Sequence, residues 1–130
     1  MTNSIHQENI FNANPSQIYS ILTDSTKFSE LTGGAPTDIN NEAGGTFSLF
    51  GGMIHGRNIE LVENRLIVQA WRPGNWNEGA YSIVRFELKE HDAGTLLILD
   101  HTGFPEEQAE HLSVGWVENY WKPLENLLSK

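Results

Sequence analysis

The sequence has no cysteine and few basic residues. Without cysteine the chain can form neither disulfides nor thiolate metal sites, which leaves its redox compartment open. Its 8 Lys and Arg residues are outnumbered by 17 Asp and Glu, which gives a formal net charge of −9. Binding to nucleic acid or to an anionic membrane requires clustered cations. We therefore expect neither partner, and we attribute the acidity to solubility.

Long apolar runs are also missing. No stretch approaches the roughly 20 apolar residues that a membrane-spanning helix needs. The polar segment Met1–Glu8 does not have the pattern of a signal peptide. A chain of 130 residues is most simply one domain. We expect residues 1–130 to form a single cytoplasmic domain.

The sequence lacks motifs that carry chemistry. No two of its five histidines have an i, i+4 spacing, and the HExxH pattern does not occur. There is no G-x-S-x-G motif, and without cysteine there is no thiol nucleophile. These observations favour a non-catalytic protein, and they predict no metal, no cofactor and no catalytic residue.

Alternating strands and turns dominate what is present. Asn14, Pro15 and either Asp24 or Ser25 predict the starts of two short helices, the second of which ends before Gly33. Short turns join the successive strands, as in an antiparallel meander. The predicted strands cover residues 4–11, 38–40, 46–50, 53–63, 66–71, 80–89 and 95–102.

The last quarter of the chain, Pro105–Lys130, predicts one long helix. Its apolar side chains cover roughly 200° of a helical wheel, wider than the roughly 100° stripe of a surface helix. Such a helix must be packed on more than one side, and we expect a curved sheet to wrap it. Gly115 lies on the polar arc, where we expect a close approach of a strand or loop. The apolar arc holds Leu112, Val114, Trp116, Val117, Tyr120, Trp121, Leu124, Leu127 and Leu128.

A set of aromatic side chains and one histidine are candidates for a site between sheet and helix. The alternation of the last strand places His101 on the same face as Leu97 and Leu99. His101 is then either a satisfied core histidine, which we favour, or a polar group at the mouth of a cavity. The aromatic residues either fill the core, which is the simpler interpretation, or line a gap that a ligand occupies. They are Trp71, Trp76, Trp116, Tyr120 and Trp121.

Several short motifs resemble the C-terminal domain of the activator of heat-shock protein 90 ATPase. Trp71-Arg72 followed by Trp76-x-Glu78-Gly79 is similar to the stretch after that domain's fourth strand. The resemblance runs from about Asn9 to Leu128. It is carried further by Gly45-Thr46-Phe47-Ser48-Leu49, Ile54-x-Gly56, Glu60-Leu61-Val62, Gly103-Phe104-Pro105, and Gly115-Trp116 with Tyr120.

This resemblance implies a START-like, helix-grip fold of the SRPBCC superfamily. The fold class is α+β, with a curved antiparallel sheet of about six or seven strands wrapped around a long C-terminal helix. Two short helices follow the first strand, and a hydrophobic cavity often remains between sheet and helix. Because members of this superfamily differ widely in function, the fold alone does not identify one.

Three functions follow as hypotheses. The first is a non-catalytic domain that binds a small apolar ligand in the cavity, lined by Trp71, Phe86, His101, Trp116 and Tyr120. The second is a chaperone-associated interaction module, implied by the resemblance together with a role in the stress response. In this case Trp76, which we expect to be exposed on its loop, would contact the partner.

The third hypothesis is a cyclase- or hydrolase-like enzyme of the kind found elsewhere in the superfamily. It requires polar groups that converge in the cavity, and the strands offer only His101, Gln69 and Arg57. If these three are scattered, the hypothesis loses its basis. We expect the protein to be a monomer or a homodimer.

Overall fold

Seven antiparallel strands form one curved sheet in the computed structural model, which describes residues 4–129. Their spatial order is β1-β7-β6-β5-β4-β3-β2, so β1 lies beside β7 and the remaining strands form a meander. Strands were predicted at all seven positions, with ends within about two residues. The strands are β1 Ser4–Phe11, β2 Asp38–Ile39, β3 Thr46–Leu49, β4 Ile54–Val62, β5 Leu66–Pro73, β6 Ser82–His91 and β7 Gly94–Thr102.

Two short helices, α1 (Pro15–Thr23) and α2 (Ser25–Leu31), follow the first strand. The Asn14 side chain accepts a hydrogen bond from the Gln17 backbone N–H at 2.9 Å, and the Asp24 carboxylate accepts one from the Lys27 backbone N–H at 2.9 Å. Each cap satisfies a backbone donor that the first helical turn leaves free. The predicted cap Asn14 is confirmed, and of the two alternatives Asp24 is the second cap.

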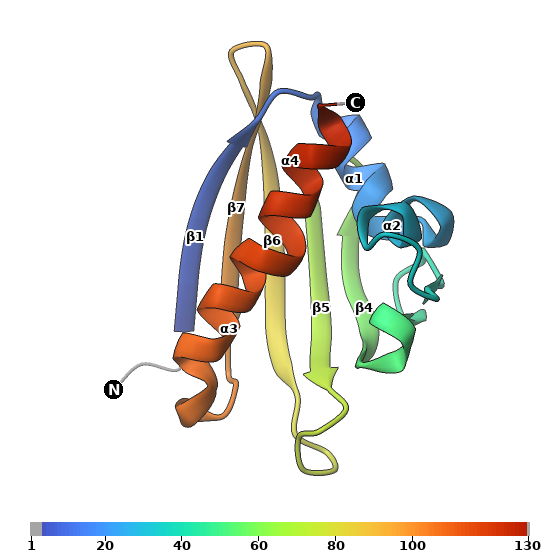
Figure 1. The fold of residues 1–130 in the computed structure, drawn as a ribbon, viewed down its shortest axis with the longest axis vertical. Coiled ribbons are helices and arrows are strands. Elements are labelled where there is room, and N and C mark those ends of the chain that lie inside the picture. Colours follow the sequence, from blue (N-terminus) through green and yellow to red (C-terminus); the bar gives the residue numbers. More distant parts are fainter. Residues whose placement is uncertain (1–3, 130) are drawn as a thin grey trace.

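A helix in four consecutive parts covers one face of the sheet (Figure 1). These are the 3-10 turn η2 (Glu106–Gln108), α3 (Ala109–Trp116), the π-helical segment η3 (Val117–Trp121) and α4 (Lys122–Leu128). We refer to them together as the C-terminal helix. It runs diagonally across β1, β7, β6 and β5, with α1 and α2 beside its far end. The predicted α+β helix-grip fold is confirmed.

The π-helical segment changes which side chains face the sheet. The Lys122 backbone N–H donates to the Val117 oxygen, five residues earlier. The wider turn lets the adjacent residues Tyr120 and Trp121 both be buried. The helical wheel with a constant 100° step also placed these two residues on the apolar arc. Its placement of Val114 on that arc is wrong, because this residue, which precedes the π-helical segment, is 57% exposed.

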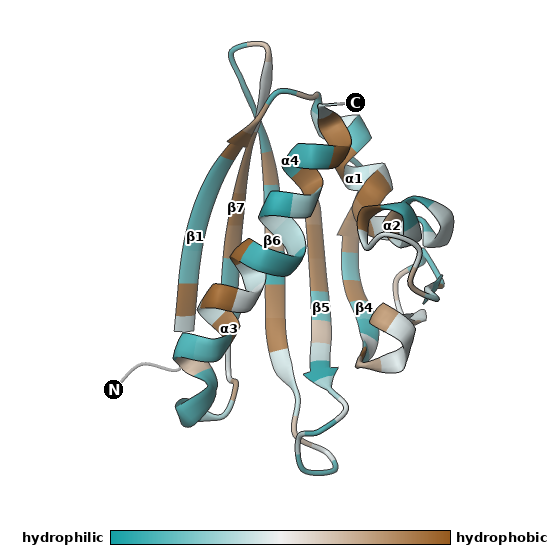
Figure 2. Ribbon diagram, viewed as in Figure 1, coloured by the Kyte–Doolittle hydropathy of each residue, from teal (hydrophilic) through white to brown (hydrophobic). Residues whose placement is uncertain are grey.

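The strands alternate between a buried and an outer face, as Figure 2 shows in the brown bands under the C-terminal helix. On β6 the predicted period of two is confirmed, with every second side chain from Ser82 to Leu88 buried. On β7 the buried positions are Thr95, Leu97, Leu99 and His101. The core therefore lies between the sheet and the C-terminal helix.

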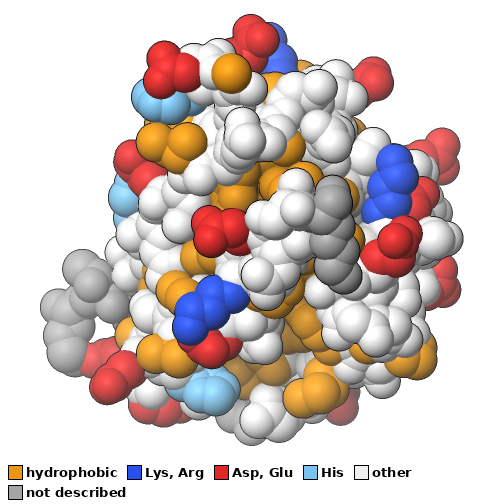
Figure 3. Space-filling model, turned by 45° about the horizontal axis from the view of Figure 1, so that its top comes forward, with side chains coloured by type: hydrophobic (Ala, Val, Ile, Leu, Met, Phe, Trp, Pro, Cys, Tyr) orange, Lys and Arg blue, Asp and Glu red, His pale blue; other side chains and the backbone are white. Residues whose placement is uncertain are grey.

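The molecular surface carries scattered charge. On the face drawn in Figure 3 the acidic side chains are scattered, and the few Lys and Arg side chains lie apart from one another, each near an acidic side chain. Within residues 4–129, no helix has the length and apolar character required to cross a membrane.

Candidate functional site

Aromatic side chains fill the middle of the space between the sheet and the C-terminal helix. The Trp116 ring centroid lies 4.4 Å from that of Tyr120 and 5.7 Å from that of Phe86. Trp71 stacks on Trp116 at 5.4 Å with an interplanar angle of 28°. All four side chains are buried. The internal cavity that these residues were expected to line is instead occupied by the residues themselves.

His101 lies inside this aromatic cluster and is fully buried. The Trp116 indole Nε1–H donates to His101 Nδ1 at 3.0 Å. Because an indole nitrogen can only donate, Nδ1 is the acceptor and the imidazole proton is on Nε2. That Nε2–H donates to Ser82 Oγ at 2.7 Å, and the Ser82 hydroxyl donates to the Trp71 carbonyl oxygen at 3.1 Å. His101 is therefore a satisfied core histidine.

Burial lowers the pKa of His101 from its ordinary 6.5 to about 4. The neutral ring also suits its hydrogen bonds, since a protonated Nδ1 would face the Trp116 N–H with a second donor. The histidine thus ties helix α3 to strands β7, β6 and β5 as an uncharged connector.

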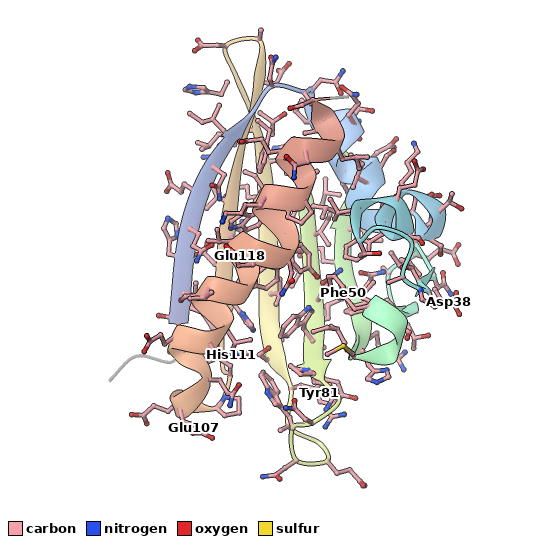
Figure 4. All side chains as sticks on the ribbon, viewed as in Figure 1. Asp38, Phe50, Tyr81, Glu107, His111 and Glu118 are labelled. Atoms are coloured by element: carbon pink, nitrogen blue, oxygen red, sulfur yellow. The ribbon has the colours of Figure 1, made fainter. Side chains whose placement is uncertain are left out.

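An open groove of about 500 Å³ remains at one end of this interface. We call it the end groove. Its inner wall is formed by the aromatic residues Trp71, Trp116 and Tyr120. Phe50 and Met53 form one side of the groove, and residues of α3, including Leu112 and Gly115, form the other side. In Figure 4, the labelled residue Phe50 marks the first side and the labelled residue His111 marks the second. Phe50 is the first residue of the short 3-10 turn η1 (Phe50–Gly52), and His111 is on α3.

No Asp, Glu, Lys or Arg lies among the described residues that line the end groove. Burial raises the pKa of the Tyr120 hydroxyl above its ordinary value of 10. The nearby Trp71 indole acts in the opposite direction on this pKa, although Trp71 Nε1 is not in hydrogen-bonding geometry with any described group. Apart from the exposed imidazole of His111, the polar groups of the lining are side-chain amides, indoles and the Tyr120 hydroxyl, set in an apolar wall.

The side of the groove at η1 has an unusual backbone. Phe50, Gly51 and Gly52 all have positive φ, at 53°, 68° and 96°. For a residue with a Cβ this conformation costs of order 1 kcal/mol. Edge-to-face contacts of Phe50 with Phe28 at 5.5 Å and with Tyr120 at 5.8 Å hold it in place. The predicted strand 46–50 therefore ends one residue early.

The five candidate ligand-binding residues divide into two groups. Trp71, Trp116 and Tyr120 come together on the wall of the end groove. Phe86 and His101 do not line the groove and lie deeper, in contact with Trp116. Sequence patterns did not identify the residues on the groove's open sides, because these come from the turn after β3 and from the start of the C-terminal helix.

The predicted exposure of Trp76 is wrong. Its side chain is only 8% exposed and packs edge-to-face on Trp71 at 6.1 Å. The Arg72 guanidinium donates to the backbone oxygens of Trp76 at 2.6 Å and Asn77 at 3.1 Å. These bonds fold the loop back on β5, so that the indole turns inward rather than toward a partner.

The polar groups required by the enzyme hypothesis do not converge. Gln69 is buried and donates to Asn58 Oδ1 at 3.2 Å, whereas Arg57 is exposed and donates to the Gly44 oxygen at 2.8 Å. His101 is engaged with Ser82 and Trp116. Among the described residues, no three His, Asp or Glu side chains are placed to hold a metal ion.

The expectation for Gly115 also needs correction. A Cβ built at this position would meet only Asn119 Nδ2, at 3.7 Å. Within residues 4–129, no strand or loop comes within 4 Å of that Cβ. Gly115 instead borders the end groove, and the missing side chain leaves that space open.

A second hollow of about 900 Å³ lies between the start of α1 and the β4–β5 turn. Its basic residues Arg65, Arg85 and Lys89 are matched by three glutamates, one of which, Glu87, pairs with Arg85 at 3.1 Å. With its charges balanced and its lining largely polar, this hollow suggests no particular ligand.

Comparisons with known proteins agree on one family. The family model described as "Activator of Hsp90 ATPase homolog 1-like protein" matches residues 12–129. The chain is 33% identical to the mouse protein "Activator of 90 kDa heat shock protein ATPase homolog 2", over 98% of this chain and 38% of that protein. Human homolog 1 is 26% identical, over 86% of this chain and 33% of its own length. The chain thus spans little more than a third of these relatives.

Solved structures show the same fold. The crystal structure of an HSP90 activator from Plasmodium falciparum superposes with a TM-score of 0.92 at 28% identity, over 97% of this chain and 96% of that one. The solution structure of the Aha1 dimer from Colwellia psychrerythraea gives a TM-score of 0.80 at 19% identity, over 96% and 95% of the two chains. At that identity the likeness concerns the fold alone.

Proposed function

This chain belongs to the family of Activator of Hsp90 ATPase homolog 1-like proteins, and we propose that it is a non-catalytic domain that binds a small apolar ligand in the end groove. The observation that carries the proposal is the groove itself. About 500 Å³ is within the usual range of ligand pockets. Four aromatic side chains, Phe50, Trp71, Trp116 and Tyr120, border it. Such walls supply a large apolar contact area.

The filled interior behind the groove supports this location. The aromatic cluster and the His101 hydrogen bonds leave the wall of the groove fixed before a ligand arrives. A preformed wall reduces the entropy lost on binding. The ligand would therefore bind at the end of the helix–sheet interface rather than deep inside it.

Filling the groove tests the proposal. The variant Gly115→Phe places a ring in the groove, where Gly115 has free space. The control Val114→Phe adds a ring to the exposed side of the same helix, outside the groove. The neutral apolar dye Nile red should bind the wild type and the control, and about 10-fold more weakly to Gly115→Phe. Equal binding by all three proteins would remove the end groove as the site.

A second candidate function is an interaction with a heat-shock protein 90 chaperone. It is favoured by the 33% identity to the mouse activator across nearly the whole chain and by the close superposition on the Plasmodium falciparum activator. Since Trp76 is buried, any contact through its loop would use the exposed neighbour Tyr81, and Trp76 would hold the loop in shape. Both functions are consistent with a cytoplasmic protein.

The ATPase rate of the host's own heat-shock protein 90 decides this candidate. Activation that saturates with added protein and weakens in Tyr81→Ala would support it. Unchanged ATPase activity at high molar excess would end it. Nile red binding should be the same in Tyr81→Ala and the wild type, because Tyr81 lies outside the end groove.

A further inference from the structure

We propose that the end groove selects uncharged, flat aromatic compounds that carry a hydroxyl or carbonyl oxygen, and that it rejects both anions and cations. This inference rests on the proposed ligand-binding function and adds the chemical class of the ligand. It follows from the charge, the shape and the hydrogen-bonding groups of the groove lining.

Charge is the first criterion. The chain carries a formal charge of −9, yet none of its Asp, Glu, Lys or Arg residues is among the described residues of the groove lining. An ion that enters an apolar site loses hydration, and only a paired charge can compensate for that loss. Apart from the exposed imidazole of His111, the described lining of the end groove offers no such partner. A neutral ligand avoids the penalty.

Shape is the second criterion. Trp71 and Trp116 stand nearly parallel, 5.4 Å apart at 28°, and Tyr120 adjoins Trp116 at 4.4 Å. Phe50 borders the groove from the opposite side, where its contact with Tyr120 holds it. Aromatic rings favour flat partners through stacked or edge-to-face contact. The lining therefore suits a planar ring system better than a flexible aliphatic chain.

Unused hydrogen-bonding groups are the third criterion. Trp71 is 3% exposed, and its Nε1–H has no hydrogen-bond partner among the described residues. A buried donor without a partner is costly and uncommon. An indole can be satisfied only by an acceptor, such as a hydroxyl or carbonyl oxygen. A ligand oxygen is an acceptor of this kind.

The rim of the groove repeats this neutral polar character. Asn75, Gln108 and Asn119 lie there, and in the described part of the chain their amide groups make no hydrogen bonds. Side-chain amides both donate and accept, so they can pair with either a hydroxyl or a carbonyl group. They provide no net charge to hold an ion.

Probes with one bicyclic body test the selectivity. 2-Naphthol, naphthalene, 2-naphthoate and (2-naphthylmethyl)ammonium differ mainly in charge and in the oxygen they carry. Their affinities can be compared by isothermal titration at about pH 7.5. We expect 2-naphthol to bind tightest, naphthalene to bind a few-fold more weakly, and each charged probe to bind about 10-fold more weakly than 2-naphthol.

A gain of function sharpens the test. Asn119→Lys places one cation at the rim, and it should improve the affinity for 2-naphthoate about 10-fold without changing that for 2-naphthol. Asn126→Lys adds the same charge at an exposed position of the same helix outside the groove, and it should change neither affinity.

The outcomes separate the two proposals. Charged probes that bind the wild type as tightly as 2-naphthol would overturn the selectivity but leave the ligand site in place. An equal effect of the two lysine variants on 2-naphthoate would also overturn it, because the groove would then not be sensing local charge. Binding by none of the probes, or 2-naphthol binding that Gly115→Phe does not weaken, would overturn the ligand-binding function itself.

Discussion

The middle and the end of the helix–sheet interface are built from the same aromatic residue types, but they have different properties. In the middle, Phe86 and His101 pack against Trp116, and both imidazole nitrogens have hydrogen-bond partners. At the end, Trp71 has an indole N–H without a partner, and about 500 Å³ stays open. Trp71, Trp116 and Tyr120 belong to both regions. Abundant aromatic residues therefore do not distinguish a core from a binding site, whereas unfilled space does.

Truncating one side chain in each region should show the difference most strongly. Phe86→Ala removes a ring that is 1% exposed and enclosed by Trp116, Tyr120 and Trp121. We expect it to lower the free energy of unfolding by about 4 kcal/mol, because the cavity cannot collapse. Leu112→Ala, at the border of the end groove, should cost about 2 kcal/mol. Urea denaturation measures both, and equal losses would show that the two regions are packed alike.

The pH dependence of the free energy of unfolding should reveal the buried His101 in the middle of the interface. The folded pKa of His101, about 4, lies below its unfolded value of 6.5, so between these values the unfolded chain binds more protons. The stabilisation is complete above about pH 6.5 and is lost as the pH falls toward 4, by about 3 kcal/mol in all. Denaturation curves along this range should show the decline, which His101→Leu should largely remove.

His6 titrates in a different window. Hydrogen bonds to Asp100 and Glu8 raise the pKa of its exposed ring. The stabilisation that the protonated His6 ring contributes is therefore complete below pH 6.5 and is lost as the pH rises above that value. A decline toward acid that persists unchanged in His101→Leu would contradict the assignment to His101.

Removing the His101 ring should also destabilise the protein where histidine is neutral. His101→Leu leaves the Trp116 indole N–H buried without an acceptor, whereas the Ser82 hydroxyl still donates to the Trp71 carbonyl. One unsatisfied buried donor costs about 2 kcal/mol. Denaturation at about pH 7.5 provides the measurement. A loss below about 0.5 kcal/mol would mean that the network adds little to the packing.

The smallest predicted effect is a gain in stability from a substitution at the end groove. Gly115→Ala should raise the free energy of unfolding by about 1 kcal/mol, because alanine favours the helix and its methyl group meets only Asn119 Nδ2 at 3.7 Å. Gly56→Ala is the contrasting substitution. Its Cβ would clash with the Ala70 backbone oxygen, and the substitution should destabilise the protein. Thermal denaturation separates a gain from a loss, and destabilisation by Gly115→Ala would indicate that this part of the groove is not open.

The sequence alone determined the framework of this protein. The period of two on β6, the caps at Asn14 and Asp24, and the wide apolar arc of the C-terminal helix each depend on residues close together in the chain. Local periodicity and capping are sufficient to predict such elements. The short family motifs then placed the elements in a helix-grip fold.

Tertiary structure alone decided where space remains. Trp76 is buried because Arg72 folds its loop inward, and Val114 is exposed although the helical wheel placed it on the apolar arc. The end groove joins Phe50 from the turn after β3, Trp71 from β5 and Leu112 from α3. Whether side chains so distant in sequence fill a volume or leave it open depends on their packing in three dimensions, which residue spacing does not encode.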